Sequence, residues 1–329
     1  MRTGGGREGF ASRPTVLGVA MGYTAPAMTR VSALIPSLLF VALALPGCKK
    51  DSEPEAKDDK KEEPDPEPAP EPPPAEPRFD LSGPKPPETS TVLFAIDGAL
   101  MPLACFDKDK GEIVAGVDCA KLVAEGSEVY MESSFGKKAL EKTGAGTKMS
   151  MCGDDGAIPM AALDKGEQYD WGVWPKSLGP DFVQVHPDTW SDRGARLEEA
   201  EAKAAQDALA KAGKTKGEFQ SKQKATVDID GDGKDELFVS AILANPRDPD
   251  THHYSGLLMA KGGDLAQFEI VDTVTRGSDE IKLFGATDLD GDGTRELWTG
   301  LSFDGGAGER VLVLGDEPKP LGKWSCGAG

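Results

Sequence analysis

Two acidic segments with the same pattern, D-x-D-G-D-G-x-x-E, recur in this chain and constrain its fold more than any other feature. The first begins at Asp228 and the second at Asp288, an offset of 60 residues. Between them lie four strand-like runs, ELFVSAIL, HYSGLLMAK, AQFEIVDTV and EIKLFGATD, and ELWTGLSF and ERVLVLG follow the second segment. A fixed period that holds about four strands is typical of a repeated β-meander or of propeller-like blades. The sequence therefore predicts a mainly β fold.

The spacing of the acidic residues predicts a metal site in each segment. Carboxylates at alternate positions of a tightly turning backbone converge on one point, and they supply the oxygen ligands that Ca²⁺ prefers. The alternative is an acidic Asp/Gly hairpin turn without metal, but two copies in register favour calcium. We expect weak sites, with dissociation constants of about 10⁻⁴ to 10⁻³ M, that act as structural staples. The predicted ligands are Asp228, Asp230, Asp232, the Lys234 carbonyl and Glu236 in the first loop, and Asp288, Asp290, Asp292, the Thr294 carbonyl and Glu296 in the second.

An EF-hand does not fit these loops. It requires a glutamate at position 12, where Val239 and Thr299 stand, and a helix after the loop, where LFVSAIL and LWTGL indicate strands. Strand, acidic loop and strand, from about Lys224 to Leu314, resemble the FG-GAP/VCBS family, known from integrin α-subunit propellers and many bacterial surface proteins. The resemblance implies Ca²⁺ in a loop that joins two strands. Because only two good loops are present, we expect a partial propeller; the DKDKG at 107–111 is interpreted as a plain hairpin turn.

The N-terminal part of the chain predicts export and anchoring. Residues 28–48 have an arginine, an apolar run and a final L-P-G-C, and they resemble a bacterial lipoprotein signal. The resemblance implies that Cys48 carries a lipid; an ordinary secretory signal or an uncleaved anchor is the alternative. Residues 1–27 are interpreted as a non-translated or disordered extension. Residues 49–88, rich in proline and glutamate, predict a disordered tether. Lysines beside Cys48 favour the outer membrane or cell surface over the inner membrane.

The remaining chain divides into three predicted segments. Residues 89–190 predict a β-rich domain with a short helix at 136–142. Residues 191–214 predict one connecting α-helix, capped by Ser191 and ended by Gly213. Residues 215–329 predict the FG-GAP-like calcium-binding β domain.

Four cysteines besides Cys48 suit an exported chain with disulfides. Cys105 and Cys119 flank a short strand-turn-strand pattern, which favours a local bridge. Cys152 and Cys326 would form the second bridge, although all three connectivities remain open and zinc is a further alternative.

The net charge and the absence of common catalytic motifs restrict the classes of function open to this chain. The net charge of −19 disfavours nucleic acid as a partner. The pair His252-His253 is interpreted as an exposed loop. Trp171, Trp174 and Trp190 could line a ligand groove, but core packing explains them more simply. No G-x-S-x-G, H-E-x-x-H or P-loop motif is present.

These features favour a lipid-anchored protein of the bacterial cell envelope that acts without catalysis. It would be a binding, adhesion or assembly module with two structural calcium ions. The partners are then the membrane, through the lipid, and a protein or glycan ligand. The alternative is an exported, calcium-stabilised hydrolase, for which His186 is the first candidate base.

Overall fold

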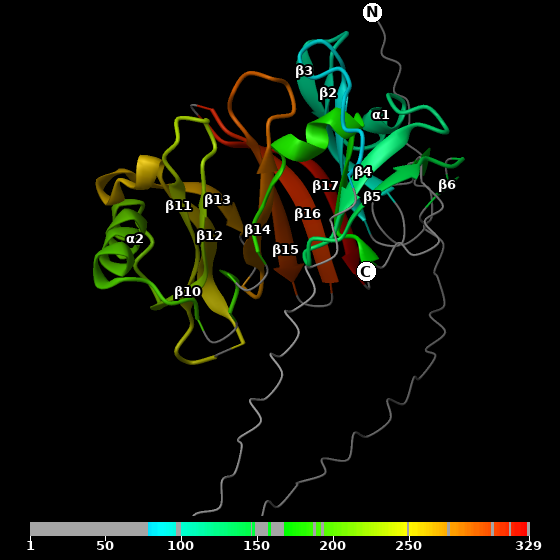
Figure 1. The fold of residues 1–329 in the computed structure, drawn as a ribbon. Coiled ribbons are helices and arrows are strands. Elements are labelled where there is room, and N and C mark those ends of the chain that lie inside the picture. The colour runs from blue at the N-terminus through cyan, green and yellow to red at the C-terminus, as the bar shows by residue number, and fades with distance from the viewer. Residues whose placement is uncertain are drawn as a thin grey trace, which may run out of the picture. The chain divides into compact units, whose positions relative to one another are not determined.

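Antiparallel sheets carry most of the regular structure, so the predicted mainly β fold is confirmed (Figure 1). The computed structural model describes residues 78–96, 100–145, 147–148, 157–158, 168–186, 189–191, 194–248, 250–274, 277–303, 306–315 and 317–327. The predicted extension, the signal and residues 49–77 of the tether lie outside these residues, as does Cys152. The prediction of a disordered tether is wrong for residues 78–88, which pack on the fold: the Pro84 carbonyl accepts from the Ser177 hydroxyl, and Lys85 Nζ lies 2.8 Å from Asp181. No helix among the described residues is long and apolar enough to span a membrane.

The first sheet has six strands in the order β3-β2-β1-β8-β4-β5. Its strands are β1 (Thr91–Ile96), β2 (Leu100–Asp107), β3 (Glu112–Ala115), β4 (Glu128–Glu132), β5 (Lys138–Lys142) and β8 (Trp171–Trp174). A short helix, α1 (Val117–Ala120), follows β3, and β6 (Thr147–Lys148) pairs with β7 (Ala157–Ile158). Asp107 pairs with Glu112 across the β2–β3 turn, so residues 107–111 form the plain hairpin turn that the sequence predicts.

The helix predicted at 136–142 is wrong. Residues 138–142 form strand β5, which pairs with β4, for example Leu140 with Tyr130. The letters KALEK favour a helix, but five residues are too few to form a stable one alone. Pairing with β4 satisfies the backbone hydrogen bonds instead, and tertiary context overrides local propensity.

The two acidic loops each join the first two strands of a four-stranded meander. The first meander is β10 (Glu218–Val227), β11 (Glu236–Ala244), β12 (His252–Ala260) and β13 (Phe268–Val274). The second is β14 (Glu280–Thr287), β15 (Glu296–Phe303), β16 (Gly306–Val313) and β17 (Lys319–Gly327), with β9 (Val183–Gln184) added beside β14. Val227 pairs with Glu236 in one and Thr287 with Glu296 in the other. The 60-residue repeat is therefore a repeat of structure.

The connecting helix is shorter than predicted. Helix α2 (Glu199–Lys211) begins after Glu198, whose N–H donates to the Glu201 side chain at 2.8 Å. Ser191 is not its cap, because the helix begins only at Glu199; the Ser191 N–H donates to the Lys222 carbonyl in β10. Gly213 lies at the C′ position with φ 77°, as predicted, and Lys214 N–H donates to the Leu209 carbonyl. The 3₁₀ helices are η2 (Lys176–Asp181), η4 (Lys261–Gly263) and η5 (Leu265–Gln267).

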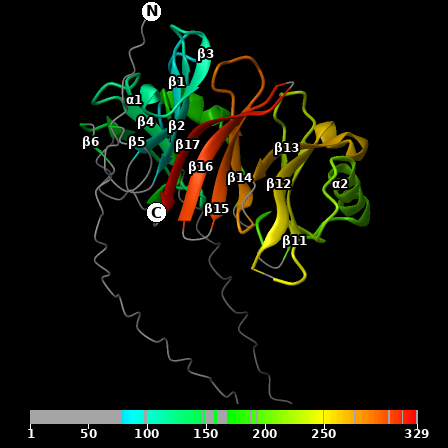
Figure 2. The ribbon, with the colours of Figure 1, turned by 180° about the vertical axis from the view of Figure 1, so that it is seen from behind.

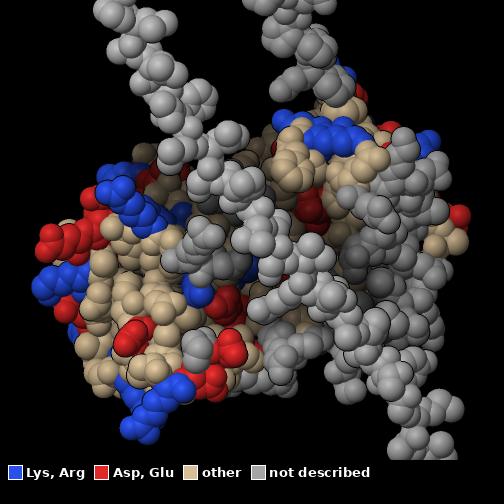
Figure 3. Space-filling model, turned by 90° about the horizontal axis from the view of Figure 1, so that it is seen from below, with Lys and Arg blue, Asp and Glu red and all other residues tan. Residues whose placement is uncertain are grey.

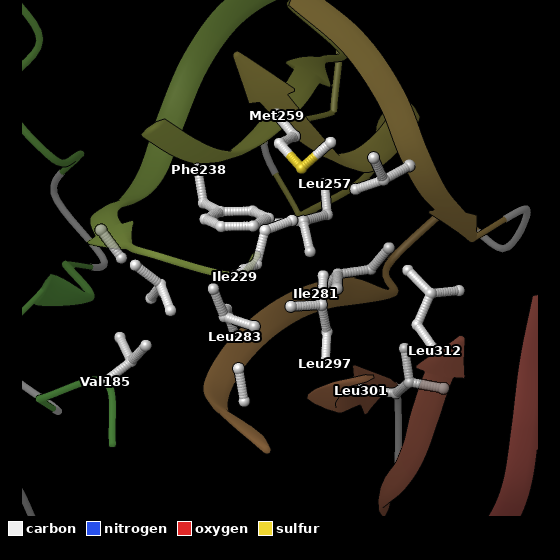
Figure 4. Packing of buried hydrophobic residues seen from close by; sticks show 14 residues of the cluster. Val185, Ile229, Phe238, Leu257, Met259, Ile281, Leu283, Leu297, Leu301 and Leu312 are labelled. Carbon is white, nitrogen blue, oxygen red and sulfur yellow. The ribbon is translucent and has the colours of Figure 1, made fainter. Parts of the chain in front are cut away.

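Buried side chains join neighbouring sheets into shared cores. One cluster lies between the two meanders and includes Phe238, Leu257 and Leu283 (Figure 4). Helix α2 lies on the other face of β11 and β12 (Figure 2). There its Leu209 packs with Val239 and Leu258.

A further cluster crosses from the six-stranded sheet to the second meander. It contains Leu93 and Trp171 together with Leu289 and Trp298. Segments 89–190 and 215–329, which the sequence separates, thus share one hydrophobic core.

Candidate functional site

The first acidic loop is folded by its own carboxylates. Asp228 accepts hydrogen bonds from the N–H groups of Gly231, at 2.7 Å, and Gly233, at 3.1 Å. The Asp232 carboxylate accepts from Lys234 N–H at 2.7 Å. Both glycines have positive φ, 70° and 82°, which residues with a side chain rarely adopt. The turn draws alternate side chains to the same side of the backbone.

The second loop repeats these contacts at the equivalent positions. Asp288 accepts from Gly291 at 2.7 Å and from Gly293 at 3.1 Å, and Asp292 accepts from Thr294 N–H at 2.7 Å. The two sequences therefore produce the same local geometry in two different surroundings.

A buried glutamate closes each loop. Glu236 is 1% exposed and accepts from Ile229 N–H at 2.9 Å; Glu296 is 3% exposed and accepts from Leu289 N–H at 2.8 Å. Burial raises the pKa of Glu296 to about 8, and nearby carboxylates add to the rise. Burial also raises the pKa of Asp290. Charged carboxylates in such a place are costly unless a cation neutralises them.

The carboxylates converge, but not in the same combination in both loops. In the first loop, oxygens of Asp228, Asp230 and Glu236 lie within 4.8 Å of one another. In the second, the group at this distance is formed by all three aspartates, Asp288, Asp290 and Asp292. Two predicted ligands are not in these groups: Asp232 contacts Lys234, and Glu296 accepts from Leu289 N–H. This donor set of hard oxygens fits Ca²⁺.

Residue Lys234 distinguishes the first loop from the second. Its ammonium lies 3.3 Å from Asp232 Oδ2, and both side chains are solvent-accessible. The equivalent residue in the second loop is Thr294, which has no charge. The positive charge of Lys234 therefore partly neutralises the carboxylates of the first loop. The second loop has no positive charge at this position.

The loops are connected to each other and to the first residue of β1. Arg295 N–H donates to the Ile229 carbonyl at 2.8 Å, and its guanidinium donates to the Asp228 carbonyl. In the second loop the equivalent carbonyl, that of Leu289, accepts from the Thr91 hydroxyl at 2.6 Å. Each loop therefore accepts a hydrogen bond from another part of the chain: the first loop from Arg295, and the second from Thr91. The sequence did not single out Arg295 as a contact between the loops. It does show an arginine in the second loop at the position where the first loop has Asp235.

Of the predicted disulfides, the structure describes one. Cys105 and Cys119 are bonded, with Cα atoms 5.5 Å apart. Cys152 lies outside the described residues, and for Cys326 only the backbone pairing of β17 is described, opposite Ala307. The bridge attaches α1 to β2, the strand beside the edge strand β3.

A second candidate region is a cavity of about 350 Å³ between the six-stranded sheet and the second meander. His186, Ser134 and Asp170 are among its lining residues. The Ser134 hydroxyl donates to Asp170 at 2.8 Å. Activation of a serine nucleophile requires its hydroxyl to donate to a base such as histidine.

The core-packing interpretation is confirmed for Trp171, whereas the interpretation of the histidine pair as a loop is wrong. His252-His253 begin strand β12 rather than forming a loop, and His252 Nε2 lies 2.6 Å from the Asp279 carbonyl oxygen. Trp171 is a buried core residue, and Trp190 lines the cavity. Trp174 packs in a separate cluster. Sequence reasoning missed the contributions of Phe284 and Trp298 to the cavity, since only the fold brings them there.

Comparison with known proteins adds no relative. No protein-family model, no curated protein and no solved structure matches this chain.

Proposed function

We propose that this protein is a binding module of the bacterial cell envelope, anchored by a lipid on Cys48 and stabilised by two structural calcium ions. The observation that carries the proposal is the repetition of one loop geometry. Both loops turn on glycines of positive φ, place an aspartate across two backbone N–H groups and close on a buried glutamate.

Calcium is favoured by the donor set. The converging groups are carboxylates, which suit a hard divalent cation, and no histidine or cysteine is among them. A bound ion would offset the repulsion among the carboxylates and oppose protonation of Glu296. Its free energy of binding would then stabilise the folded hairpins. The resemblance to FG-GAP/VCBS repeats supports the same assignment.

The envelope location is supported by the sequence of residues 28–88. The lipoprotein-like signal, the cysteine at its end and the Pro/Glu-rich tether would hold the folded part away from a membrane. On the face that Figure 3 shows, basic and acidic side chains are intermixed among the described residues. With the net charge of −19, this favours a partner other than nucleic acid.

Thermal unfolding with and without calcium tests the proposal. Calcium at about 100 times its dissociation constant stabilises a protein by ~2.7 kcal/mol for each site. We expect the melting temperature to fall on addition of a calcium chelator and to recover with excess Ca²⁺. The double variant Asp228→Asn, Asp288→Asn should lose this response, whereas Asp109→Asn, in the ordinary β2–β3 turn, should retain it. A melting temperature that is the same in chelator and in calcium would overturn the calcium assignment.

A membrane-fractionation experiment tests the anchor. The wild-type chain, expressed in a bacterium with a radiolabelled fatty acid, should sediment with membranes and carry the label, and Cys48→Ser should lose the label. A variant that keeps the label would contradict lipid attachment at Cys48.

The hydrolase alternative is favoured by one observation, the presence of His186, Ser134 and Asp170 in one cavity. Hydrolysis of p-nitrophenyl acetate, compared between the wild type, Ser134→Ala and His186→Ala, tests it. Equal rates in all three would reject this site as catalytic. A rate that both substitutions abolish would replace the binding function by hydrolysis.

A further inference from the structure

Three of the five tryptophans in the chain line one cavity. Trp171 comes from β8, Trp190 forms an isolated bridge with Gln223, and Trp298 comes from β15. The volume of about 350 Å³ lies within the range of small-molecule sites, which are commonly apolar with a few polar groups. Aromatic residues make up only 6% of the chain, so their concentration here requires an explanation.

The buried part of the wall is held by aromatic contacts. Trp171 stacks on Phe182, with ring centroids 3.7 Å apart, and Trp298 makes an edge contact with Phe284 at 5.0 Å. The indole N–H of Trp298 donates to Glu309 at 2.7 Å. Such contacts preorganise the cavity and lower the entropy cost of binding.

The amide of Gln223 is occupied by the protein itself. It donates to the Leu283 carbonyl at 2.8 Å and accepts from Leu283 N–H at 2.7 Å. In contrast, the buried indole N–H of Trp171 has no hydrogen-bond partner among the described residues. A buried donor without a partner is costly, so this part of the wall is not fully satisfied by the protein itself.

Two aromatic rings of the wall remain partly accessible, those of Trp190 and Phe284, whereas Trp171 and Trp298 are buried. Phe135, which follows the lining residue Ser134, is 93% exposed. Partly exposed aromatic faces beside a cavity offer apolar contact area to a ligand.

The polar groups around these rings carry both signs of charge. Asp170 and Glu309 are acidic, and the Lys282 ammonium lies 4.2 Å from the Trp190 ring centroid. A cationic ligand on the Trp190 ring would be repelled by the Lys282 ammonium beside it. An anionic ligand would meet two carboxylates on a protein of net charge −19. An uncharged ligand with an apolar face and hydrogen-bonding edges avoids both difficulties.

We infer that this cavity binds a neutral saccharide ring. The C–H face of the sugar would pack against Trp190 and Phe284, and its hydroxyl groups would bond to Asp170, Glu309 and the Gln184 amide. This inference rests on the proposed binding function and names its ligand class and its site.

Saturation-transfer NMR on the folded protein tests the inference with defined probes. The saccharide probes are glucose, galactose and N-acetylglucosamine; tetramethylammonium and benzyl alcohol represent the cationic and plain aromatic classes. We expect transfer to at least one saccharide. Trp190→Ala should weaken that binding by about tenfold or more. The matched control Trp174→Ala removes a half-buried tryptophan from a different cluster and should leave binding unchanged.

Different results of this experiment overturn the saccharide inference and the calcium assignment. Absence of transfer to all three saccharides, or transfer only to tetramethylammonium or benzyl alcohol, overturns the inference, as does full saccharide binding by folded Trp190→Ala. If Trp190→Ala does not fold, saccharide binding is measured with Asp170→Asn instead, since this exposed side chain can lose its charge without a change of shape. Saccharide binding that Asp170→Asn leaves unchanged then overturns the inference. The experiment is repeated with calcium chelator. A protein whose melting responds to calcium but which binds no saccharide refutes this inference alone, whereas saccharide binding without a calcium response refutes the calcium assignment alone.

Discussion

At the scale of single residues, Gly231 and Gly291 occupy the same position in the two loops but have different neighbours. Both adopt positive φ, 70° and 78°. A Cβ atom on Gly231 would have no atom within 4 Å, whereas one on Gly291 would lie 2.6 Å from the carbonyl carbon and oxygen of Pro86. The second loop is therefore in close contact with the backbone of the segment before β1.

This difference predicts unequal effects of one substitution. Gly231→Ala should cost ~1–2 kcal/mol, the penalty of a side chain in the left-handed region. Gly291→Ala should cost a further ~1–3 kcal/mol, because the Pro86 backbone must move. Urea unfolding of the two variants at the same calcium concentration measures the difference. Equal losses of stability would show that the contact with Pro86 yields without cost.

At the scale of elements, a side chain joins the first strands of the two meanders. Gln223 of β10 is 3% exposed and bonds to both backbone groups of Leu283 on β14, as a neighbouring strand would. We predict that Gln223→Leu lowers the free energy of unfolding by ~2–4 kcal/mol, because two buried backbone groups lose their partners. Gln220→Leu, at an exposed position of the same strand, is the control. A loss no larger than that of the control would mean that the two strands pair without the amide.

The contact between the two acidic loops depends in the same way on a single side chain, that of Arg295. Removal of its guanidinium leaves the Asp228 carbonyl without this donor, so we predict that Arg295→Ala costs ~1–3 kcal/mol. The control is Asp235→Ala, an exposed residue at the equivalent position of the first loop. Chemical unfolding in chelator removes any contribution of calcium. A destabilisation equal to that of the control would contradict a role for Arg295 in joining the loops.

At the scale of the whole molecule, the described sheets share their cores. The cluster that contains Trp171 and Trp298 spans the two segments that the sequence separates, and β9 pairs with β14 across the same division. Residues 72–329 accordingly form one compact unit.

This sharing predicts cooperative unfolding. Urea titrations followed by tryptophan fluorescence and by far-ultraviolet circular dichroism should give one transition with coincident midpoints. Two separated transitions would indicate that residues 89–190 and 215–329 are independent domains, as the sequence alone had suggested.

Several local features could be predicted from the sequence because neighbouring residues determine them. The acidic loops form hairpins, since Asp and Gly at fixed spacing satisfy the turn internally. Gly213 ends α2 for a similar reason. The prediction failed where local propensity was weak or misleading: residues 138–142 form a strand, and β17 was not anticipated because KPLGKWSCG lacks an alternating pattern.

What the sequence by itself determined is thus the hairpin form of the two loops, the period that links them and most of the strands around them. Only the tertiary structure decided that Arg295 of one loop bonds to the other, that Gln223 takes the place of a strand neighbour, and that Trp190 and Trp298 line one cavity. The physical reason is range. A turn is stabilised by bonds between residues two to five positions apart, whereas these contacts join residues far apart in the chain and depend on how whole sheets pack.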